Sequence, residues 1–207
     1  MINNIYCVGR NYAEHAAELG NRVEEDPVIF SKPNSSLIVG QNITLPTFSH
    51  DVHYETEIVI RIAKSAFQIE PDHAAEYYDS IALGLDLTAR DLQSELKNKK
   101  LPWLLAKGFK GSCYVTEFFP KQTFSSPIRF ALTLNGQTVQ NGNSDDMIFS
   151  INHIIAFISQ YIALQPGDII FTGTPKGVGK LEAGDSLTLT LEGNTLAELH
   201  VEAACSP

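Results

Sequence analysis

The sequence predicts a strand-rich α+β fold that forms one domain over residues 1–207. Extended segments outnumber helical ones, and the two kinds do not alternate as they do in a doubly wound parallel sheet. No internal repeat, low-complexity tract or linker divides the chain. A chain of this length buries roughly 70% of its unfolded surface, which is sufficient for a sizeable core.

The first third of the chain contains the clearest strand. Residues 5–8 are apolar and predict a short strand, and residues 11–19 predict a short helix that ends at Gly20. Along residues 52–63 the side chains alternate between two faces, and Glu55 and Glu57 fall on the same face. A period of two over so many residues predicts one continuous strand.

Local signals also define the remaining elements. Pro71 favours a helix over residues 72–79, and an apolar strand over 81–87 precedes a helix over 89–97. Asn135-Gly136 is the strongest short signal for a β-hairpin. We expect hairpin strands at 130–134 and 138–140, an apolar helix at 151–161, and strands at 169–172, 186–191 and 195–201, the last two joined at 193–194.

The charge balance excludes one class of partner. The chain has 15 Lys and Arg against 24 Asp and Glu, a formal net charge of -9. Nucleic-acid binders concentrate basic residues, so we expect no nucleic-acid partner. We interpret the one basic cluster, Lys97, Lys99 and Lys100, as the solvated end of a helix. An acidic protein that acts on an acidic substrate needs local positive charge, from a metal ion, Lys or Arg.

Three features bear on cellular location. No segment approaches the run of about 18 apolar residues that a membrane-spanning helix needs. The amino terminus lacks the basic region and apolar run of a signal peptide. Cys7, Cys113 and Cys205 lie far apart, which fits a reducing compartment and neither a disulfide framework nor a zinc site. We therefore expect a cytoplasmic protein that is not associated with a membrane.

Three acidic residues could form a metal site. On one strand Glu55 and Glu57 would lie about 6.6 Å apart on the same face. Asp86 lies near the end of an apolar strand, where an isolated buried charge is very costly. Oxygen ligands without His or Cys select Mg²⁺, Mn²⁺ or Ca²⁺. The alternatives are a solvated polar face for the two glutamates, and for Asp86 a helix cap or a pair with Arg90.

Further polar residues are candidates for catalysis. His15 and Glu18 share one face of the predicted first helix, and a His oriented by a carboxylate can act as a general base. Lys107, if buried, would supply positive charge for an anionic substrate. An ordinary surface helix and a Lys with a packed stem and a solvated head are the alternatives. The Gly-rich segment 172–179 lacks the spacing of a phosphate-binding loop and is better interpreted as a loop that faces the substrate.

Taken together, these segments resemble the fumarylacetoacetate hydrolase family, particularly its short acylpyruvase-like members. No single motif is specific, but the set follows the family order over nearly the whole chain. The matching segments are Val8-Gly-Arg-Asn-Tyr12 with His15 and Glu18; Phe30-Ser-Lys-Pro33; His53-Tyr-Glu-Thr-Glu57; Gly84 to Asp91 with Gln93; Leu101-Pro-Trp103 with Lys107-Gly-Phe109; Asn135-Gly136; and Pro166 to Gly179.

The resemblance implies a mixed β-sheet roll with a few short helices, a homodimer, and a bound Mg²⁺ with Mn²⁺ or Ca²⁺ as alternatives. The family pattern begins at Val8, so we do not expect the amino-terminal domain of the larger fumarylacetoacetases, nor fumarylacetoacetate as substrate. The implied site residues are Glu55, Glu57 and Asp86 for the metal, His15 and Glu18 on a lid helix for activating water, Lys107 as the active-site lysine, and Arg10, Gln93 and Thr174 for substrate.

The implied enzyme is a metal-dependent hydrolase that cleaves a C–C bond of acylpyruvates or related 2,4-diketo acids, through a metal-bound pyruvate enolate. Decarboxylation or tautomerisation of oxaloacetate, and hydration or isomerisation of a 2-keto-4-enoate, use the same enolate and stay open. The substituent at C4 of the substrate, which decides among them, cannot be identified from the sequence. A non-catalytic metal-binding dimer is the alternative from another class.

Overall fold

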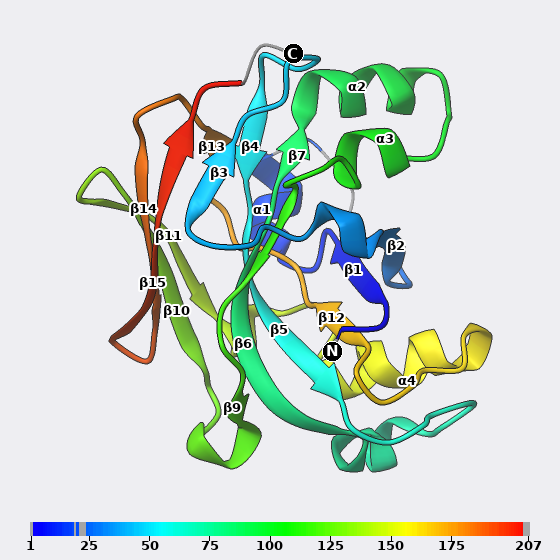
Figure 1. Ribbon diagram of the computed structural model, residues 1–207. Coiled ribbons are helices and arrows are strands. Elements are labelled where there is room, and N and C mark those ends of the chain that lie inside the picture. Colours follow the sequence, from blue (N-terminus) through cyan, green and yellow to red (C-terminus); the bar gives the residue numbers. More distant parts are fainter. Residues whose placement is uncertain (1, 19, 21–23, 205–207) are drawn as a thin grey trace.

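The computed structural model describes residues 2–18, 20 and 24–204. It confirms a strand-rich α+β fold in which curved, mixed sheets face each other and the few helices lie at the periphery (Figure 1). The helices are α1 (Ala13–Glu18), α2 (Arg90–Asn98), α3 (Leu104–Lys107) and α4 (Ile151–Tyr161), with 3-10 turns at Asn34–Ser36, Pro71–Glu76, Lys121–Thr123 and Ser144–Asp146. None of the helices in the described part of the chain is both long and apolar enough to cross a membrane.

The largest sheet has the strand order β2-β1-β12-β5-β6-β8, and β9 also pairs with β6. Its β1 and β12 are parallel and its other pairs are antiparallel, which makes the sheet mixed. The strands are β1 (Ile5–Gly9), β2 (Val28–Lys32), β5 (Thr56–Ile62), β6 (Tyr78–Asp86), β8 (Cys113–Val115), β9 (Phe119–Pro120) and β12 (Ile169–Phe171).

Two smaller sheets complete the roll. A five-stranded sheet has the order β11-β10-β14-β15-β3, and a three-stranded sheet the order β13-β4-β7. Their strands are β3 (Asn42–Thr44), β10 (Arg129–Leu134), β11 (Gln137–Asn143), β14 (Ser186–Leu191) and β15 (Asn194–Glu202), and then β4 (Val52–Tyr54), β7 (Thr88–Ala89) and β13 (Gly179–Lys180).

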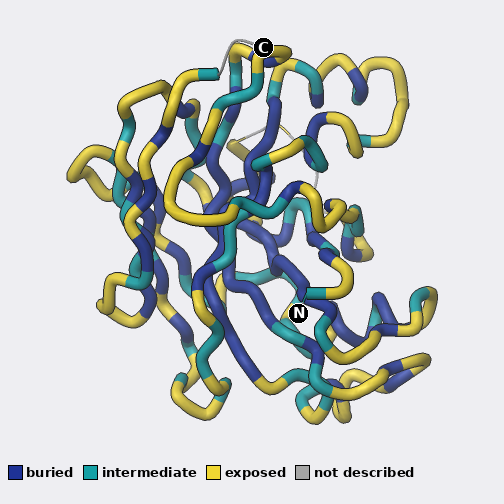
Figure 2. The backbone as a smooth tube through the Cα atoms, viewed as in Figure 1, coloured by how far each residue is buried: buried dark blue, intermediate teal, exposed yellow. Residues whose placement is uncertain are grey.

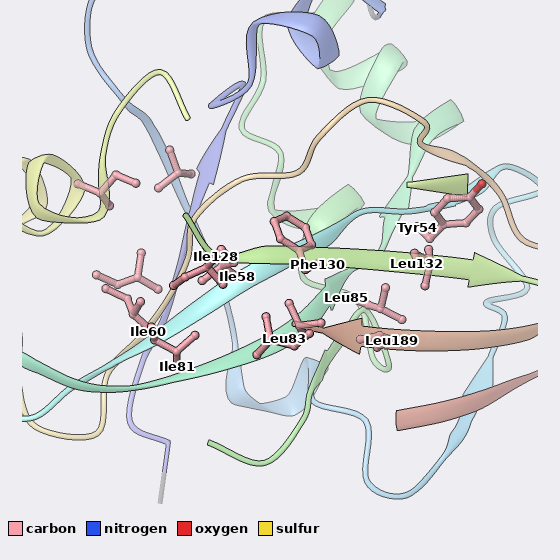
Figure 3. Close-up of a cluster of buried hydrophobic side chains, with 14 of the residues drawn as sticks. Tyr54, Ile58, Ile60, Ile81, Leu83, Leu85, Ile128, Phe130, Leu132 and Leu189 are labelled. Atoms are coloured by element: carbon pink, nitrogen blue, oxygen red, sulfur yellow. The ribbon is translucent and has the colours of Figure 1, made fainter. Parts of the chain in front are cut away.

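The main core lies between the seven-stranded and the five-stranded sheets. Ile58 of β5 and Leu83 of β6 pack toward Phe130 of β10 and Leu189 of β14, and all four are at most 2% exposed (Figure 3). Burying such a side chain contributes roughly 1.5–3 kcal/mol. The buried trace in Figure 2 runs along these central strands, while loops and outer helical faces are exposed. The core therefore holds β5 and β6 rigidly, and both strands lead into the candidate site.

Most local predictions are confirmed. The hairpin at Asn135-Gly136 has left-handed backbone at both residues, with φ of 49° and 81°, as its tight turn requires. Helix α4 spans the predicted 151–161, and the Ser150 side chain caps it by accepting from His153 N–H. The helix predicted at 11–19 is α1; Leu19 lies outside the described residues. At the last hairpin the turn residues are Glu192 and Gly193, one position earlier than predicted.

Two predictions were wrong. Residues 52–63 do not form one strand: β4 and β5 belong to different sheets, and the chain passes between them at Glu55. There the N–H of Thr56 donates to the side-chain oxygen of Gln140, 2.9 Å away, instead of to a neighbouring strand. The predicted helix 72–79 is only the 3-10 turn Pro71–Glu76, because Tyr78 already pairs with Ile62 in the sheet.

Candidate active site

Three buried carboxylates meet where β5 and β6 run together. Glu55, Glu57 and Asp86 each offer an oxygen within 4.8 Å of the others, and all are at most 5% exposed. The N–H of Asp86 donates to the carbonyl of Glu55 at 2.9 Å, which aligns the end of β6 with the start of β5. β5 is buried on both faces, so the solvated polar face that we considered for the two glutamates does not exist. The predicted metal ligands therefore lie together in the interior.

Two lysines and an arginine neutralise most of this acidic charge. The Lys107 ammonium donates to Glu55 Oε2 and to Asp86 Oδ2, each at 2.7 Å. Lys32 Nζ lies 2.7 Å from Asp86 Oδ1, at an angle that makes no directed hydrogen bond, and donates to three carbonyls, those of Leu87, Lys107 and Ser112. Arg90 Nη2 pairs with Glu55 Oε1 at 2.5 Å. The alternative Asp86–Arg90 pair is thus not formed.

The same charges set the protonation of the two glutamates. Burial acts to raise the pKa of Glu55, but Lys107 and Arg90 overcome it and hold that pKa well below its usual range. Burial, together with the negative charges of Asp86 and Glu55, raises the pKa of Glu57 well above its ordinary value. Glu55 is therefore ionised, whereas ionised Glu57 is disfavoured unless a cation lies beside it.

The donor set fits a hard divalent cation. Within the described residues Glu57 has no ion-pair partner, and its carboxylate accepts one hydrogen bond, from Gly173 N–H at 2.6 Å. A buried carboxylate without a cation is costly. Three carboxylates with no His or Cys among them are typical ligands of Mg²⁺, Mn²⁺ or Ca²⁺. A divalent ion would supply the charge that Glu57 lacks.

His15 and Glu18 lie on α1 as the sequence predicts. His15 Nδ1 is 3.4 Å from Glu18 Oε2, and both Glu18 oxygens accept from Gly177 N–H, at 3.1 and 3.2 Å. Burial lowers the pKa of His15, against smaller raising effects of Glu55 and Glu18. His15 is thus a neutral imidazole near pH 7, and Glu18, which contacts its Nδ1, links α1 to the Gly-rich loop. This arrangement suits a general base.

A small cavity of about 30 Å³ opens beside these groups, room for roughly one or two water molecules. Five of the nine predicted site residues line it: Arg10, His15, Glu55, Gln93 and Lys107. Asp86 contacts Lys107, and Glu57 lies beside Glu55 and Asp86, but neither lines the cavity, and Glu18 lies outside the lining as well. Thr174 does not line it either, because its hydroxyl is engaged by Thr56 O and the Gln140 amide, at 2.9 and 2.8 Å.

Sequence reasoning missed four residues of this site. Lys32 lies in the Phe30-Ser-Lys-Pro33 motif, and that motif was the one available signal for its role. Lys97 and Trp103 line the cavity, although we predicted Lys97 at a solvated helix end. Gln140 joins the hairpin strand β11 to Thr56 and Thr174. The positions of the last three depend on contacts between segments far apart in the sequence.

Comparisons with known proteins agree with this architecture. The family model described as fumarylacetoacetate (FAA) hydrolase C-terminal matches residues 4–202. The mitochondrial oxaloacetate tautomerase FAHD1 of Mus musculus is 42% identical over 193 residues, and the match covers 92% of this chain and 87% of the mouse protein. The mitochondrial oxaloacetate decarboxylase of Dictyostelium discoideum is 40% identical over 193 residues, covering 91% and 88%.

A solved structure supports the likeness in three dimensions. The fumarylpyruvate hydrolase from Pseudomonas aeruginosa, in complex with Mn²⁺ and pyruvate, superimposes with a TM-score of 0.91 at 32% identity. The match covers 99% of this chain and 91% of that chain. The ordered motifs, the strand-rich roll and these matches lead to one conclusion: the chain belongs to the fumarylacetoacetate hydrolase family of enzymes.

Proposed function

We propose that this protein is a divalent-metal-dependent enzyme that interconverts the enol and keto forms of oxaloacetate. The observation that carries the proposal is the convergence of three buried carboxylates, one of them without a cationic partner among the described residues, beside a cavity lined by Arg10, Arg90 and Lys107. Relatives about two-fifths identical over nine-tenths of the chain are named for reactions of oxaloacetate. Tautomerisation therefore takes precedence over the acylpyruvate hydrolysis that we expected first from the sequence.

Glu55, Glu57 and Asp86 would hold the ion. When bound, a divalent ion acts as a Lewis acid that stabilises negative charge on the oxygens of a 2-keto acid. Lys107 contributes positive charge at the same point, and Arg90 keeps Glu55 oriented through their 2.5 Å pair. The Mn²⁺ in the structure of the Pseudomonas relative supports a divalent ion and does not favour Mg²⁺ over Mn²⁺.

Proton transfer falls to His15. With Nδ1 directed to Glu18, Nε2 is the ring nitrogen available to a substrate. Because its imidazole is neutral near pH 7, His15 can accept the C3 proton of the keto form, and the imidazolium can donate a proton to the C2 oxygen, which gives the enol and restores the neutral base. The reverse reaction moves both protons the other way. Lys107, held between two carboxylates, has its pKa raised and stays charged, so it is an electrostatic group and not the base.

Hydrolysis of acylpyruvates is the second candidate. It is favoured by the relative named fumarylpyruvate hydrolase and by the His15–Glu18 pair, which could also orient a water molecule. Decarboxylation of oxaloacetate, named for the Dictyostelium relative, would need the ion but no base acting on water. The three reactions use one site and differ in what His15 does.

A substrate panel tests the proposal. Loss of the ultraviolet absorbance of enol-oxaloacetate, release of pyruvate from oxaloacetate, and cleavage of acetylpyruvate and fumarylpyruvate are followed with Mn²⁺, with Mg²⁺ and after chelation. The proposal expects tautomerisation to be fastest and to stop on chelation. Faster cleavage of the acylpyruvates would give hydrolysis first place, and no chelator-sensitive turnover at all would favour the non-catalytic alternative.

Assembly and location are separate proposals. We propose a homodimer and a cytoplasmic location, although two relatives carry mitochondrial names. Light scattering coupled to size-exclusion chromatography measures the mass in solution, and a peak at the monomer mass would contradict the dimer. Fractionation of cells that express the protein tests the location.

A further inference from the structure

The positively charged side chains around the cavity differ in whether a carboxylate of the protein pairs with them. Lys107 and Lys32 contact Asp86, Arg90 contacts Glu55, and Arg10 Nη1 pairs with Glu24 at 2.5 Å. Lys97 also lines the cavity, but in the described part of the chain no carboxylate pairs with its ammonium. It is therefore a cation in a concave site without an anion, at the point where a ligand could supply one.

Trp103 fixes the place of this cation. The Lys97 ammonium lies 5.3 Å from the centroid of the Trp103 ring, and the Arg10 guanidinium lies 5.8 Å from the same centroid. Both contacts are within the range of cation–π attraction. Arg10 already has Glu24 as its anion, so within the described residues Lys97 is the cation on this ring that lacks one.

Lys97 differs from its sequence neighbours. Arg90, Gln93 and Lys97 stand at i, i+3 and i+7 on α2 and share the face that lines the cavity. Lys99 follows α2 directly, pairs with Glu95 at 2.5 Å and has a side chain that is 60% exposed. The basic cluster that we expected at a solvated helix end is thus divided, with Lys97 turned inward and Lys99 outward. Lys99, at the carboxyl end of α2, is a matched control from the same basic cluster.

We infer that Lys97, with Arg10 across Trp103, binds the distal carboxylate of the substrate, so that the enzyme selects 2-keto dicarboxylates over 2-keto monocarboxylates. This inference rests on the proposed function, which puts the 2-keto acid head at the carboxylate triad. Arg90 pairs with Glu55 of the triad, whereas Lys97 lies against Trp103, so the two side chains reach different parts of the cavity lining. The triad would thus serve the head of the substrate and Lys97 its tail.

The pKa of Lys97 agrees with this role. Burial and the charges of Arg90 and Arg10 lower it to about 8. The other groups that face Lys97 keep their charge near pH 8: Glu55 and Lys107 stay ionised because of their pairing, and burial keeps His15 neutral. Above pH 8 the Lys97 ammonium loses its proton, and affinity for a distal carboxylate should fall.

The test measures binding and uses two probes with Mn²⁺ present. 3,3-Difluorooxaloacetate carries both carboxylates but has no C3 proton and cannot tautomerise, and pyruvate has the same head without the distal carboxylate. Calorimetric titration of the wild type and of Lys97→Met, Lys97→Arg and Lys99→Met gives the ratio of the two affinities. Met keeps the packed stem on Trp103, and thermal melting of each variant verifies that it is folded.

We expect the wild type to prefer difluorooxaloacetate and Lys97→Met to lose about 10- to 100-fold of that preference, the loss typical of a charge-assisted hydrogen bond. Pyruvate affinity should not change, and Lys99→Met should behave as the wild type. Lys97→Arg should keep the preference below pH 8 and also above it, where the wild type loses it.

Three results would overturn the inference: equal affinity of the wild type for both probes, an equal loss on both probes in Lys97→Met, or the same loss in Lys99→Met. Turnover is measured separately. A wild type that prefers the dicarboxylate but does not tautomerise oxaloacetate contradicts the proposed function and supports the carboxylate site. A wild type that turns over oxaloacetate without any dicarboxylate preference supports the proposed function and contradicts the carboxylate site.

Discussion

The two ends of the candidate cavity hold similar charges in different ways. At the triad end Lys32, Lys107 and Arg90 each contact a carboxylate of the protein, and in the part of the chain that the structure describes no cation pairs with Glu57. At the Trp103 end Lys97 has no carboxylate partner among the described residues. Each end thus lacks one charge, a cation at the triad and an anion at Trp103. A 2-keto dicarboxylate bound with a divalent ion would supply both.

The largest expected effect comes from removing a buried matched charge. The Lys32 side chain is fully buried, so Lys32→Met leaves Asp86 with one cation fewer and removes a donor from the carbonyls of Leu87, Lys107 and Ser112, the last two of which keep another donor. We expect the free energy of unfolding to fall by about 3–5 kcal/mol, and affinity for Mn²⁺ to fall with it. Urea denaturation and Mn²⁺ titration measure the two quantities. An unchanged stability would mean that Asp86 does not depend on Lys32.

His15 lines the cavity, and its replacement separates chemistry from binding. His15→Ala removes the proposed base, and we expect tautomerisation to slow by about 10²- to 10⁴-fold. Affinity for Mn²⁺ and for pyruvate should persist, because the imidazole holds neither. Stopped-flow measurement of enol loss, next to the two titrations, tests this separation. Equal losses in all three would make His15 a structural residue.

The pH dependence of turnover should also show that His15 transfers the proton. Because burial lowers the pKa of His15 below its ordinary value of 6.5, its neutral form persists as the pH falls through that value. The acid limb of kcat/KM should therefore lie below pH 6.5, and it should disappear in His15→Ala. An acid limb at or above that pH would contradict the assignment of His15 as a buried, neutral base.

The smallest effect is expected at the surface. Lys176 and Glu14 pair at 3.1 Å between the Gly-rich loop and α1, but their side chains are 63% and 72% exposed. Such pairs contribute roughly 0–1 kcal/mol, so Lys176→Met should barely change the melting temperature. A loss comparable with that of Lys32→Met would show that α1 depends on this exposed pair more than on the Glu18–Gly177 contact.

The sequence was informative where structure is decided locally. The hairpin at Asn135-Gly136 and α4 over 151–161 depend on their own residues and are confirmed. The carboxylate triad was predicted from the family resemblance, because spacing alone left other roles open for Glu55, Glu57 and Asp86, and the single strand assumed for the two glutamates is broken at Glu55. The structure brings these predicted ligands together; their role as ligands stays a prediction.

Other features depend on partners far along the chain. The strand break at Glu55 needs Gln140, which replaces a backbone partner of Thr56. The inward turn of Lys97 needs Trp103, and burial of Lys32 needs carbonyls from three other segments. No periodicity in residues 52–63 or 97–100 contains that information, because the contacts form only when α2, α3 and β2 pack together.

Binding of Mn²⁺ by the wild type and by Glu57→Gln tests the central claim most directly. Gln resembles the neutral form that Glu57 favours without a cation, and it keeps an oxygen for Gly173 N–H, so the variant should fold. The account predicts that the wild type binds Mn²⁺ in a calorimetric titration and that Glu57→Gln binds it at least about 100-fold more weakly. Equal affinity of the two proteins, or no binding by the wild type, would contradict a divalent ion held by these three carboxylates.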